Sequence, residues 1–331
     1  MPRHTFCRPR VALAALGAAT LALAGCSSES GGASGDASGE SYSIGISQLV
    51  QHPALDAAAE GFKEAFADAG ADVKWSEQNA NGEQATALTI AQQFAGQNLD
   101  AVLAVATPAA QAMVQNVTET PIFFTAVTDP VEAQLVNSLE TPGGNASGTS
   151  DATPIPDQLD LLAELVPDAK KIGVVYSSGE INSQIQVDGV KEEAAKRGWQ
   201  VETQTVTSVT EIPQAVTALG DVDAFYVPTD NMVVSGISSL VQAAEQKSIP
   251  VVAAEAGTVE GGAVATLGID YKKLGYQTGE MALKVLRDGA DIAALPVESA
   301  TEFSYVINPE AAKRQGVTIP QSIADQAETV S

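Results

Sequence analysis

An internal repeat is the feature that most restricts how this 331-residue chain can fold. A shift of 128 residues places Ile44-Gly45 on Ile172-Gly173, and the pattern Gly61-x-Lys63-Glu64 on Gly189-x-Lys191-Glu192. Further matches follow in the same order at slightly different shifts, as differences in loop length between duplicated domains would produce. The chain is long enough for two domains of ordinary size. We therefore predict two similar lobes.

Each half of the repeat alternates apolar strands with helical patterns. In the first half, strands are expected at 44–46, 73–75, 101–106 and 122–127, and helices at 56–69 and 83–97. This βαβα order is typical of a parallel sheet covered by helices on both faces, so we predict an α/β fold. A helical pattern over 274–286, a strand over 301–307 and a short helix over 309–314 are surplus to the repeat, and we expect them to return to the lobes as crossovers.

The N-terminus has the features of an export signal. Three arginines precede an apolar run over 11–24 that is too short to be a permanent membrane span. The run ends in Leu23-Ala24-Gly25-Cys26, which matches the lipobox at which bacterial lipoproteins are diacylated on cysteine and cut. We predict a lipoprotein signal peptide over 1–25, a lipid anchor on Cys26 and an extracytoplasmic protein; an ordinary cleaved secretory signal is the alternative. Residues 26–41 are rich in Ser and Gly and are expected to form a tether.

Composition narrows the possible partners. The formal charge is −24 and no basic patch survives, which makes nucleic acid and anionic membrane surfaces poor partners, so membrane contact is expected through the anchor only. Cys7 leaves with the signal peptide and Cys26 would be lipidated, so the mature fold has no thiol and no disulfide.

Polar residues follow the predicted strands in both halves of the chain. In the first half they are Gln48, His52, Thr107, Thr128 and Asp129; in the second they are Tyr176, Ser178, Asn182, Asp230, Asn231 and Glu255. The carboxyl ends of parallel strands form the edge at which ligands bind, so two such edges facing each other would make a cleft. Several of these residue types also cap helices wherever they occur, and His52 is as readily explained as a solvated or capping residue.

The two faces of this cleft differ in chemistry. Thr107-Pro108 is expected to be an N-cap followed by the first helical residue, so the hydroxyl groups of Thr107 and Thr128 and the N–H groups of Ala109 and Ala110 would suit a carboxylate. Opposite them, Asp151, Asp230 and Glu255 would suit an ammonium group. A zwitterion bridging both faces predicts an α-amino acid as the ligand.

Several longer motifs are shared with one protein family. In order they are Gln48…His52-Pro53…Asp56, Ala106-Thr-Pro-Ala-Ala-Gln111, Ala126-Val-Thr-Asp-Pro130, Gly148-x-Ser150-Asp151, Tyr176-Ser-Ser178 and Leu267-Gly-Ile-Asp270. From about Ser43 to Pro320 the chain resembles the substrate-binding lipoproteins of ABC importers that have a type I periplasmic-binding fold. It is most similar to the members that bind tryptophan or other aromatic amino acids.

This resemblance implies two Rossmann-like lobes joined by three crossing strands that act as a hinge. The N-terminal lobe would comprise 42–152 and 269–291, and the C-terminal lobe 153–268 and 292–331. The motifs add Ser150 to the candidate ligand-binding residues. An ABC permease with its ATPase would be the partner, and the protein is expected to be a monomer that needs no cofactor or metal.

Three alternatives remain open from the sequence. An enzyme is disfavoured because the mature chain has one histidine, no thiol and none of the common nucleotide-binding or nucleophile motifs, although a carboxylate-pair hydrolase is not excluded. A sugar- or nucleoside-binding protein of the same fold would stack rings on aromatic side chains, but Trp75 and Trp199 are predicted to be packing residues in the second strand of each lobe. A ligand-sensing lipoprotein without a transporter is the third.

Overall fold

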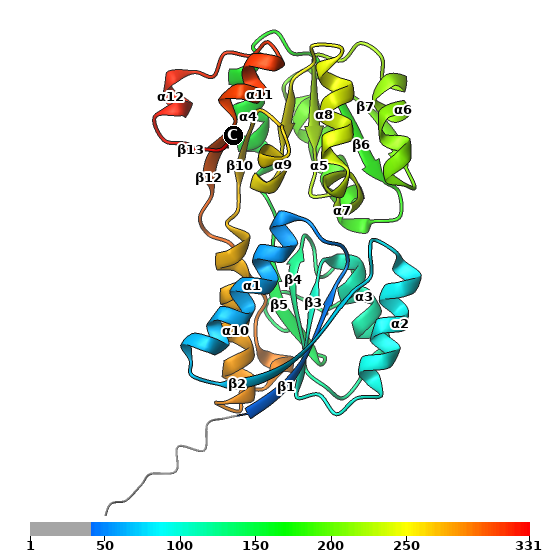
Figure 1. Ribbon diagram of the computed structural model, residues 1–331, viewed down its shortest axis with the longest axis vertical. Helices are drawn as coiled ribbons and strands as arrows, with labels where there is room; N and C mark the ends of the chain where they lie inside the picture. The colour runs from blue at the N-terminus through cyan, green and yellow to red at the C-terminus, as the bar shows by residue number, and fades with distance from the viewer. Residues whose placement is uncertain (1–40) are drawn as a thin grey trace, which may run out of the picture. The chain divides into compact units, whose positions relative to one another are not determined.

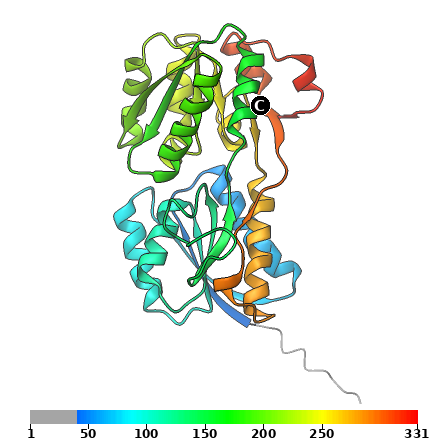
Figure 2. The same ribbon diagram turned by 180° about the vertical axis from the view of Figure 1, so that it is seen from behind.

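The computed structural model describes residues 41–331. The predicted signal peptide, the lipidation site Cys26 and the predicted tether up to residue 40 lie outside the described residues. Ser41, the last residue of the predicted tether, begins the first strand. Two sheets organise the described part of the chain (Figure 1, Figure 2).

The first sheet has six strands, all parallel, in the order β11-β5-β4-β3-β1-β2. Their bounds are β1 Ser41–Gln48, β2 Asp72–Asn79, β3 Ala101–Val105, β4 Ile122–Val127, β5 Ala146–Ser150 and β11 Glu298–Ser299. Helices α1 (Pro53–Asp68) and α10 (Tyr271–Leu286) pack together on one face, and α2 (Gln84–Ala95) and α3 (Thr107–Asn116) on the other (Figure 1). Strands β3 and β4 are buried throughout, as expected for a sheet covered on both faces.

The second sheet has seven strands in the order β13-β12-β10-β9-β8-β6-β7, with β12 antiparallel to β10. Its strands are β6 Lys171–Ser177, β7 Gln200–Val206, β8 Ala224–Val227, β9 Val251–Ala253, β10 Ala265–Gly268, β12 Ser304–Ile307 and β13 Glu328–Thr329. Its larger helices are α4 Ile155–Leu165, α5 Ile181–Lys196, α6 Ile212–Ala218 and α8 Ile237–Glu245. Shorter helices are α7 Asn231–Ser235, α9 Ala256–Glu260, α11 Pro309–Arg314 and α12 Gln321–Ala324, with 3₁₀ turns at Val209–Glu211 and, in the first lobe, at Ile292–Ala294.

The predicted repeat is confirmed by the strand order. The run β2-β1-β3-β4-β5 in the first sheet has the same order as β7-β6-β8-β9-β10 in the second. The α/β class with two Rossmann-like lobes is therefore confirmed as well. In both lobes the first strand lies between the second and the third, which is the arrangement that places strand ends at a ligand-binding edge.

The chain passes between the two sheets three times. It crosses at 151–154 between β5 and α4, at 269–270 between β10 and α10, and at 300–303 between β11 and β12. One boundary differs from the expectation that 292–331 belong to the C-terminal lobe. Strand β11 pairs with β5, and Ser147 donates a hydrogen bond to the Leu295 carbonyl, so residues 292–299 lie in the first lobe. The two-residue strand extends the first sheet before the chain crosses back.

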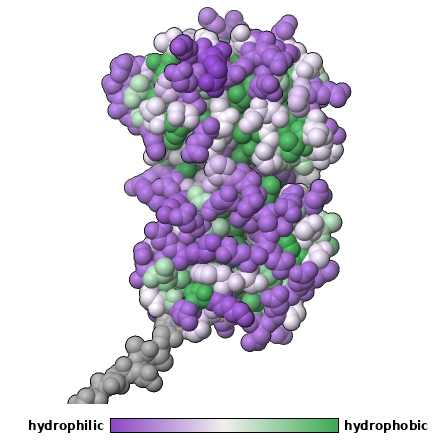
Figure 3. Space-filling model, in the orientation of Figure 1, coloured by the Kyte–Doolittle hydropathy of each residue, from purple (hydrophilic) through white to green (hydrophobic). Residues whose placement is uncertain are grey.

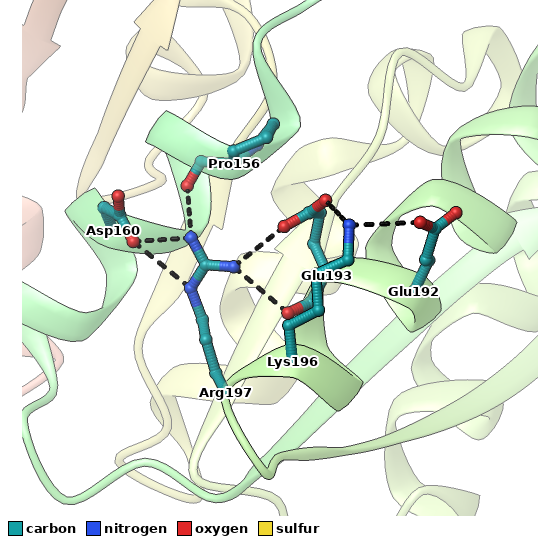
Figure 4. A network of polar contacts seen from close by, with 6 residues as sticks. All are labelled: Pro156, Asp160, Glu192, Glu193, Lys196 and Arg197. Atoms are coloured by element: carbon teal, nitrogen blue, oxygen red, sulfur yellow. Dashed lines mark hydrogen bonds and ion pairs between the residues drawn. The ribbon is translucent and has the colours of Figure 1, made fainter.

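Each lobe holds the helix that crosses into it against a helix of its own repeat. In the first lobe α1 and α10 approach so closely that a Cβ on Gly61 would overlap the Lys272 carbonyl oxygen. In the second lobe, Arg197 at the end of α5 reaches α4, where its guanidinium lies 2.5 Å from Asp160 Oδ1 and 2.9 Å from the Pro156 carbonyl oxygen (Figure 4). These contacts fix the crossing helices to the lobes that receive them.

Both tryptophans serve packing, as predicted. Trp75 stands in β2, with its ring centroid 5.7 Å from that of Phe66 in an edge-on arrangement. Trp199 directly precedes β7 and packs against the core of the second lobe. Hydrophilic side chains cover most of the face shown in Figure 3, with apolar ones in small separate patches.

Candidate functional site

Two alanines at the carboxyl ends of strands in the first lobe have left-handed backbones. Ala106 follows β3 with φ 81° and ψ 152°, a region that is essentially restricted to glycine, and Ala126 near the end of β4 has φ 55°. Such residues cost of order 1–3 kcal/mol each and persist where the surrounding structure imposes them. Both lie at the edge where the sequence predicted the ligand, so this edge is a candidate site on backbone geometry alone.

The start of α3 differs by one residue from the expectation. Ala106, rather than Thr107, is the N-cap, so the Ala110 N–H already donates to the Ala106 carbonyl at 3.0 Å. Ala110 therefore cannot offer a free N–H group, as had been expected of it. Thr107 and Ala109 remain in the first turn, where N–H groups lack intrahelical acceptors. The Thr107 hydroxyl is buried and has no hydrogen-bond partner among the described residues.

Two buried carboxylates of the second lobe hold the start of α7. Asp230 Oδ1 accepts from the Val233 N–H at 2.8 Å, and its Oδ2 accepts from the Ser177 N–H at 2.5 Å. Glu180 Oε1 accepts from the Met232 N–H at 3.1 Å. Asp230 is thus the N-cap of α7 in this structure, which agrees with the helix-capping alternative to a ligand contact.

A chain of buried hydrogen bonds crosses between the lobes. Tyr271 donates to Asp151 Oδ2 at 2.7 Å, and Thr128 of the first lobe donates to Asp151 Oδ1 at 3.0 Å. The Thr128 hydroxyl also lies 3.4 Å from the Thr229 hydroxyl of the second lobe.

Two further contacts join the lobes. His52 Nε2 is 3.4 Å from Asn231 Oδ1. Near the surface, Gln84 Nε2 of α2 donates to the Gly179 carbonyl at 2.6 Å. The facing edges of the two sheets are therefore in direct polar contact.

Burial perturbs the acids and the histidine of this region. Desolvation raises the pKa of Glu180 to about 7, with the nearby negative charge of Asp230 as a second cause. Desolvation also raises the pKa values of Asp151, Asp230 and Glu255. For His52 desolvation acts in the opposite direction and lowers the pKa to about 4, so the imidazole is neutral at pH 7. These shifts show that the site disfavours uncompensated charge.

Two hollows lie between the facing edges. The larger, of about 310 Å³, is bounded by Leu49, Gln84 and Pro108 of the first lobe and by Glu180, Val206 and Met232 of the second. The smaller, of about 10 Å³, has room for roughly one water molecule. Its polar lining is His52, Asp151, Thr229, Asp230, Asn231, Glu255 and Tyr271.

Another cavity, of about 430 Å³, lies beside the crossing at 269–270 and includes Lys272 and Lys273 of α10. Its lining also includes Gly268 at the end of β10, and it shares Ala54, Glu255 and Tyr271 with the smaller hollow. Ligand pockets usually measure about 300–1,000 Å³, so size alone does not choose between this cavity and the 310 Å³ hollow. The 310 Å³ hollow is favoured because it is lined by Pro108, two residues after the strained Ala106, and by the buried Ser177 and Glu180 of the second lobe.

The predicted site residues fall into two groups. The hollows are lined by Ser178, His52, Asp151, Asp230, Asn231 and Glu255. Thr107 and Ala109 flank Pro108, which lines the larger hollow, while Thr128 and Asn182 are bonded to the lining residues Asp151 and Thr229. Four others are held by partners outside the hollows: Gln48 by Val50 and Asp56, Asp129 by Val131 and Glu132, Ser150 by the Thr128 carbonyl, and Tyr176 by Gln184.

Sequence reasoning missed four residues of the site. They are Glu180, Thr229, Tyr271 and Gln84. Glu180 and Thr229 follow strands β6 and β8, so the strand-end signal that found their neighbours also applies to them. Tyr271 and Gln84 come from helix starts on other segments, and no local pattern marks them.

Residues 41–331 contain no group of three or more His, Cys, Asp or Glu side chains arranged to hold a metal ion. Within the same range, none of the helices is both long and apolar enough to span a bilayer.

Comparison with known proteins agrees with this geometry. Residues 43–331 match the family described as ABC transporter substrate binding protein. A tyrosine-binding protein of Clostridioides difficile is 43% identical over 301 residues, covering 88% of this chain and 87% of the relative.

Two solved structures extend the comparison. An ABC domain from Streptococcus pneumonia in complex with L-Trp is 38% identical, covers 88% of this chain and 100% of its own, and superposes with a TM-score of 0.85. The ligand-free, open structure of a substrate-binding protein with adhesive properties from Clostridium difficile is 41% identical over the same shares, with a TM-score of 0.67.

Proteins of this family bind solutes outside the cytoplasm and are not enzymes. The family match covers nearly all of the described residues, and the two-lobed fold, its three crossings and the polar seam between the lobes are what such a protein requires. The chain belongs to the family of ABC transporter substrate-binding proteins.

Proposed function

We propose that this protein captures an aromatic amino acid, tyrosine or tryptophan, between its two lobes and delivers it to an ABC importer. The observation that carries the proposal is the unpartnered hydroxyl of Thr107 at the buried start of α3, together with the buried carboxylates among the second-lobe residues that line the hollows. Buried polar groups are nearly always satisfied, so an unsatisfied donor at a ligand-binding edge indicates a missing acceptor.

The charges of the site suit the two ends of an amino acid. The first turn of α3 offers N–H groups and the positive end of a helix dipole, which favour a carboxylate. The residues that line the two hollows include Glu180, Asp151, Asp230 and Glu255 but no lysine or arginine within the described chain. An ammonium group would supply the compensating charge.

The side chain of the ligand has a place in the 310 Å³ hollow. Leu49, Val206 and Met232 contribute apolar surface from both lobes, and a methionine sulfur packs favourably against aromatic rings. The tyrosine-binding relative and the L-Trp complex, at 43% and 38% identity, support an aromatic side chain.

Similarity to the two solved structures supports closure around the ligand. Their identities to this chain are nearly equal, yet the TM-score is 0.85 with the L-Trp complex and 0.67 with the ligand-free, open structure. The arrangement described here is therefore nearer to the ligand-bound one, and we expect the three crossings to act as a hinge between it and an open form.

Calorimetric titration of the purified protein with each of the twenty amino acids tests the proposal. Tyrosine, tryptophan or both should bind at one site per chain, and binding should raise the melting temperature because the ligand engages only the folded state. Binding of none of the twenty, or binding of a sugar or nucleoside instead, would overturn it.

The anchor and the importer belong to the same proposal. Acylation at Cys26 would hold the protein at the membrane surface as a monomer that docks on an ABC permease with its ATPase. Replacing Cys26 by serine should release the protein from the membrane fraction or leave an unprocessed precursor. Unchanged processing and membrane partitioning of that variant would contradict the anchor without touching the ligand.

A further inference from the structure

Four buried carboxylates lie where the two lobes meet, and they line different hollows. Asp151 and Asp230 line the void of about 10 Å³, which is too small for any amino acid, and Glu255 lines both this void and the 430 Å³ cavity beside Lys272 and Lys273. Glu180 lines the 310 Å³ hollow. An amino acid bound in the 310 Å³ hollow therefore meets Glu180, a residue that the strand-end pattern had not singled out.

The hydrogen bonds of Glu180 leave one of its oxygens available. Oε2 accepts from Asn182 Nδ2 at 3.1 Å and from the backbone N–H and side-chain amide of Asn231 at 3.2 and 2.5 Å. Oε1 accepts only from the Met232 N–H, at 3.1 Å. Because a carboxylate oxygen can accept two hydrogen bonds, Oε1 retains a free acceptor position.

A second group beside Glu180 also lacks a donor. Asn182 Oδ1 is buried and has no hydrogen-bond partner among the described residues, although its amide nitrogen is bonded to Glu180 and to the Thr229 carbonyl. An ammonium group carries three N–H donors. Two unfilled acceptors on adjacent side chains are the complement of such a group.

We infer that Glu180 is the ammonium-binding residue of this protein, and that ligand binding there releases a proton from the site. The inference rests on the proposed function, since it assigns one end of the proposed ligand. The proton balance is simple: a protonated Glu180 gives its proton to the solvent, and the resulting carboxylate pairs with the ligand's ammonium group. Asp151, Asp230 and Glu255 then have structural roles.

The surroundings of Glu180 explain why it would hold a proton without ligand. The titratable groups that face it are Asp230 from the cap of α7, His52 from the start of α1 through Asn231, and Glu83 from the start of α2 across the hollow. Two of these groups are acids and the third is a neutral imidazole, so none of them supplies a positive charge to compensate Glu180. Burial and the nearby negative charge of Asp230 raise the pKa of Glu180 to about 7.

The experiment measures how many protons are released on binding. Calorimetric titrations with L-tyrosine at pH 7, in buffers of different ionisation enthalpy, give that number as the slope of enthalpy against buffer enthalpy. A group with a pKa near 7 should release about half a proton at pH 7 and a larger fraction at pH 6, and at both pH values the ammonium group of free tyrosine stays protonated. A slope of zero at both pH values would overturn the coupling.

A double-mutant cycle assigns the ammonium contact. The des-amino analogue of tyrosine, which keeps the ring and the carboxylate, should bind wild type roughly 30-fold or more weakly than tyrosine. Glu180→Gln should bind tyrosine weakly and discriminate little between the two ligands. Glu192→Gln, on the exposed surface of the helix α5 that follows Glu180, is the matched control, and it should keep the discrimination of wild type.

Each outcome has a separate meaning. If wild type binds no aromatic amino acid, the proposed function fails before this test begins. If wild type binds tyrosine but Glu180→Gln discriminates as well as wild type, or Glu192→Gln loses the discrimination, the assignment to Glu180 is wrong. Should Glu180→Gln fail to fold because α7 loses a cap, Glu180→Asp, which keeps the carboxylate and shortens its reach, replaces it and should also lose part of the discrimination.

Discussion

Replacing Thr107 by valine separates binding from stability, because the two should change in opposite directions. Valine keeps the branched shape at the first residue of α3 and removes only the hydroxyl. Thr107 is 1% exposed, and its buried hydroxyl has no partner among the described residues. The ligand-free protein therefore loses no hydrogen bond.

The expected changes in affinity and in stability follow from the hydrogen bond that the Thr107 hydroxyl makes only when the ligand is bound. A hydrogen bond to a charged group contributes about 1.5–3 kcal/mol, so Thr107→Val should weaken amino-acid binding roughly 10- to 150-fold. A buried unsatisfied polar group costs about 1–3 kcal/mol, so the free energy of unfolding without ligand should stay the same or rise by about 1 kcal/mol.

Calorimetric titration and urea denaturation of the ligand-free protein measure the two effects. Thr118→Val, at an exposed position just after the same helix, is the control and should change neither quantity much. Unchanged affinity in Thr107→Val would refute the role of the α3 start in binding the carboxylate. A large loss of stability would show that the hydroxyl has a structural partner.

Three further predictions concern the seam and the packing. Gln84→Ala removes the exposed hydrogen bond to the Gly179 carbonyl, which joins the two lobes. Ligand dissociation measured by stopped flow should therefore become about 2- to 10-fold faster. Gln92→Ala, on the same helix, is the control and should leave the dissociation rate unchanged. Gly275→Ala would place a methyl group against the Ala58 carbonyl oxygen where α10 meets α1, and thermal unfolding should show a loss of about 1–3 kcal/mol; an unchanged melting temperature would contradict this packing. Burial lowers the pKa of His52 to about 4 from the 6.5 of the unfolded chain, so between these pH values the unfolded state binds a proton that the folded state does not. The free energy of unfolding should therefore fall by up to roughly 3 kcal/mol as the pH falls from 6.5 to 4. Denaturant titrations of His52→Gln should lack this part of the pH dependence.

Much of the fold could be predicted from the sequence because duplication leaves a pattern that survives divergence. The strands around Ile44 and Ile172 begin equivalent units, and both stand between the second and third strands of their sheets. Strand β11, by contrast, is two residues long and has no periodicity to detect. Its pairing with β5 depends on tertiary contacts, which is why the lobe boundary was placed too early.

The candidate site was only partly predictable for a related reason. Polar residues at strand ends predicted a site at these edges, and His52, Asp151, Asp230, Asn231 and Glu255 come together there around the smaller hollow. Whether such a residue faces a cavity or its own turn depends on side-chain rotamers, so Asp129 was included although it caps the turn that follows it.

Backbone geometry and burial account for the other differences. The left-handed conformation of Ala106 makes it the N-cap of α3, which uses the Ala110 N–H in the first helical hydrogen bond. Glu180 follows β6 just before α5, a position like that of Glu255, so the strand-end pattern applies to it but does not distinguish it from its neighbours. Its burial against Asn182 and Asn231 appears only once the lobes are folded.

The crystal structure of this protein with bound L-tyrosine would test the central claim most directly. Our account predicts the ring in the hollow between Leu49 and Met232, the carboxylate within hydrogen-bonding distance of the Thr107 hydroxyl, and the ammonium group on Glu180 Oε1. An amino acid found in the reverse orientation, or in the cavity beside Lys272 and Lys273, would contradict it.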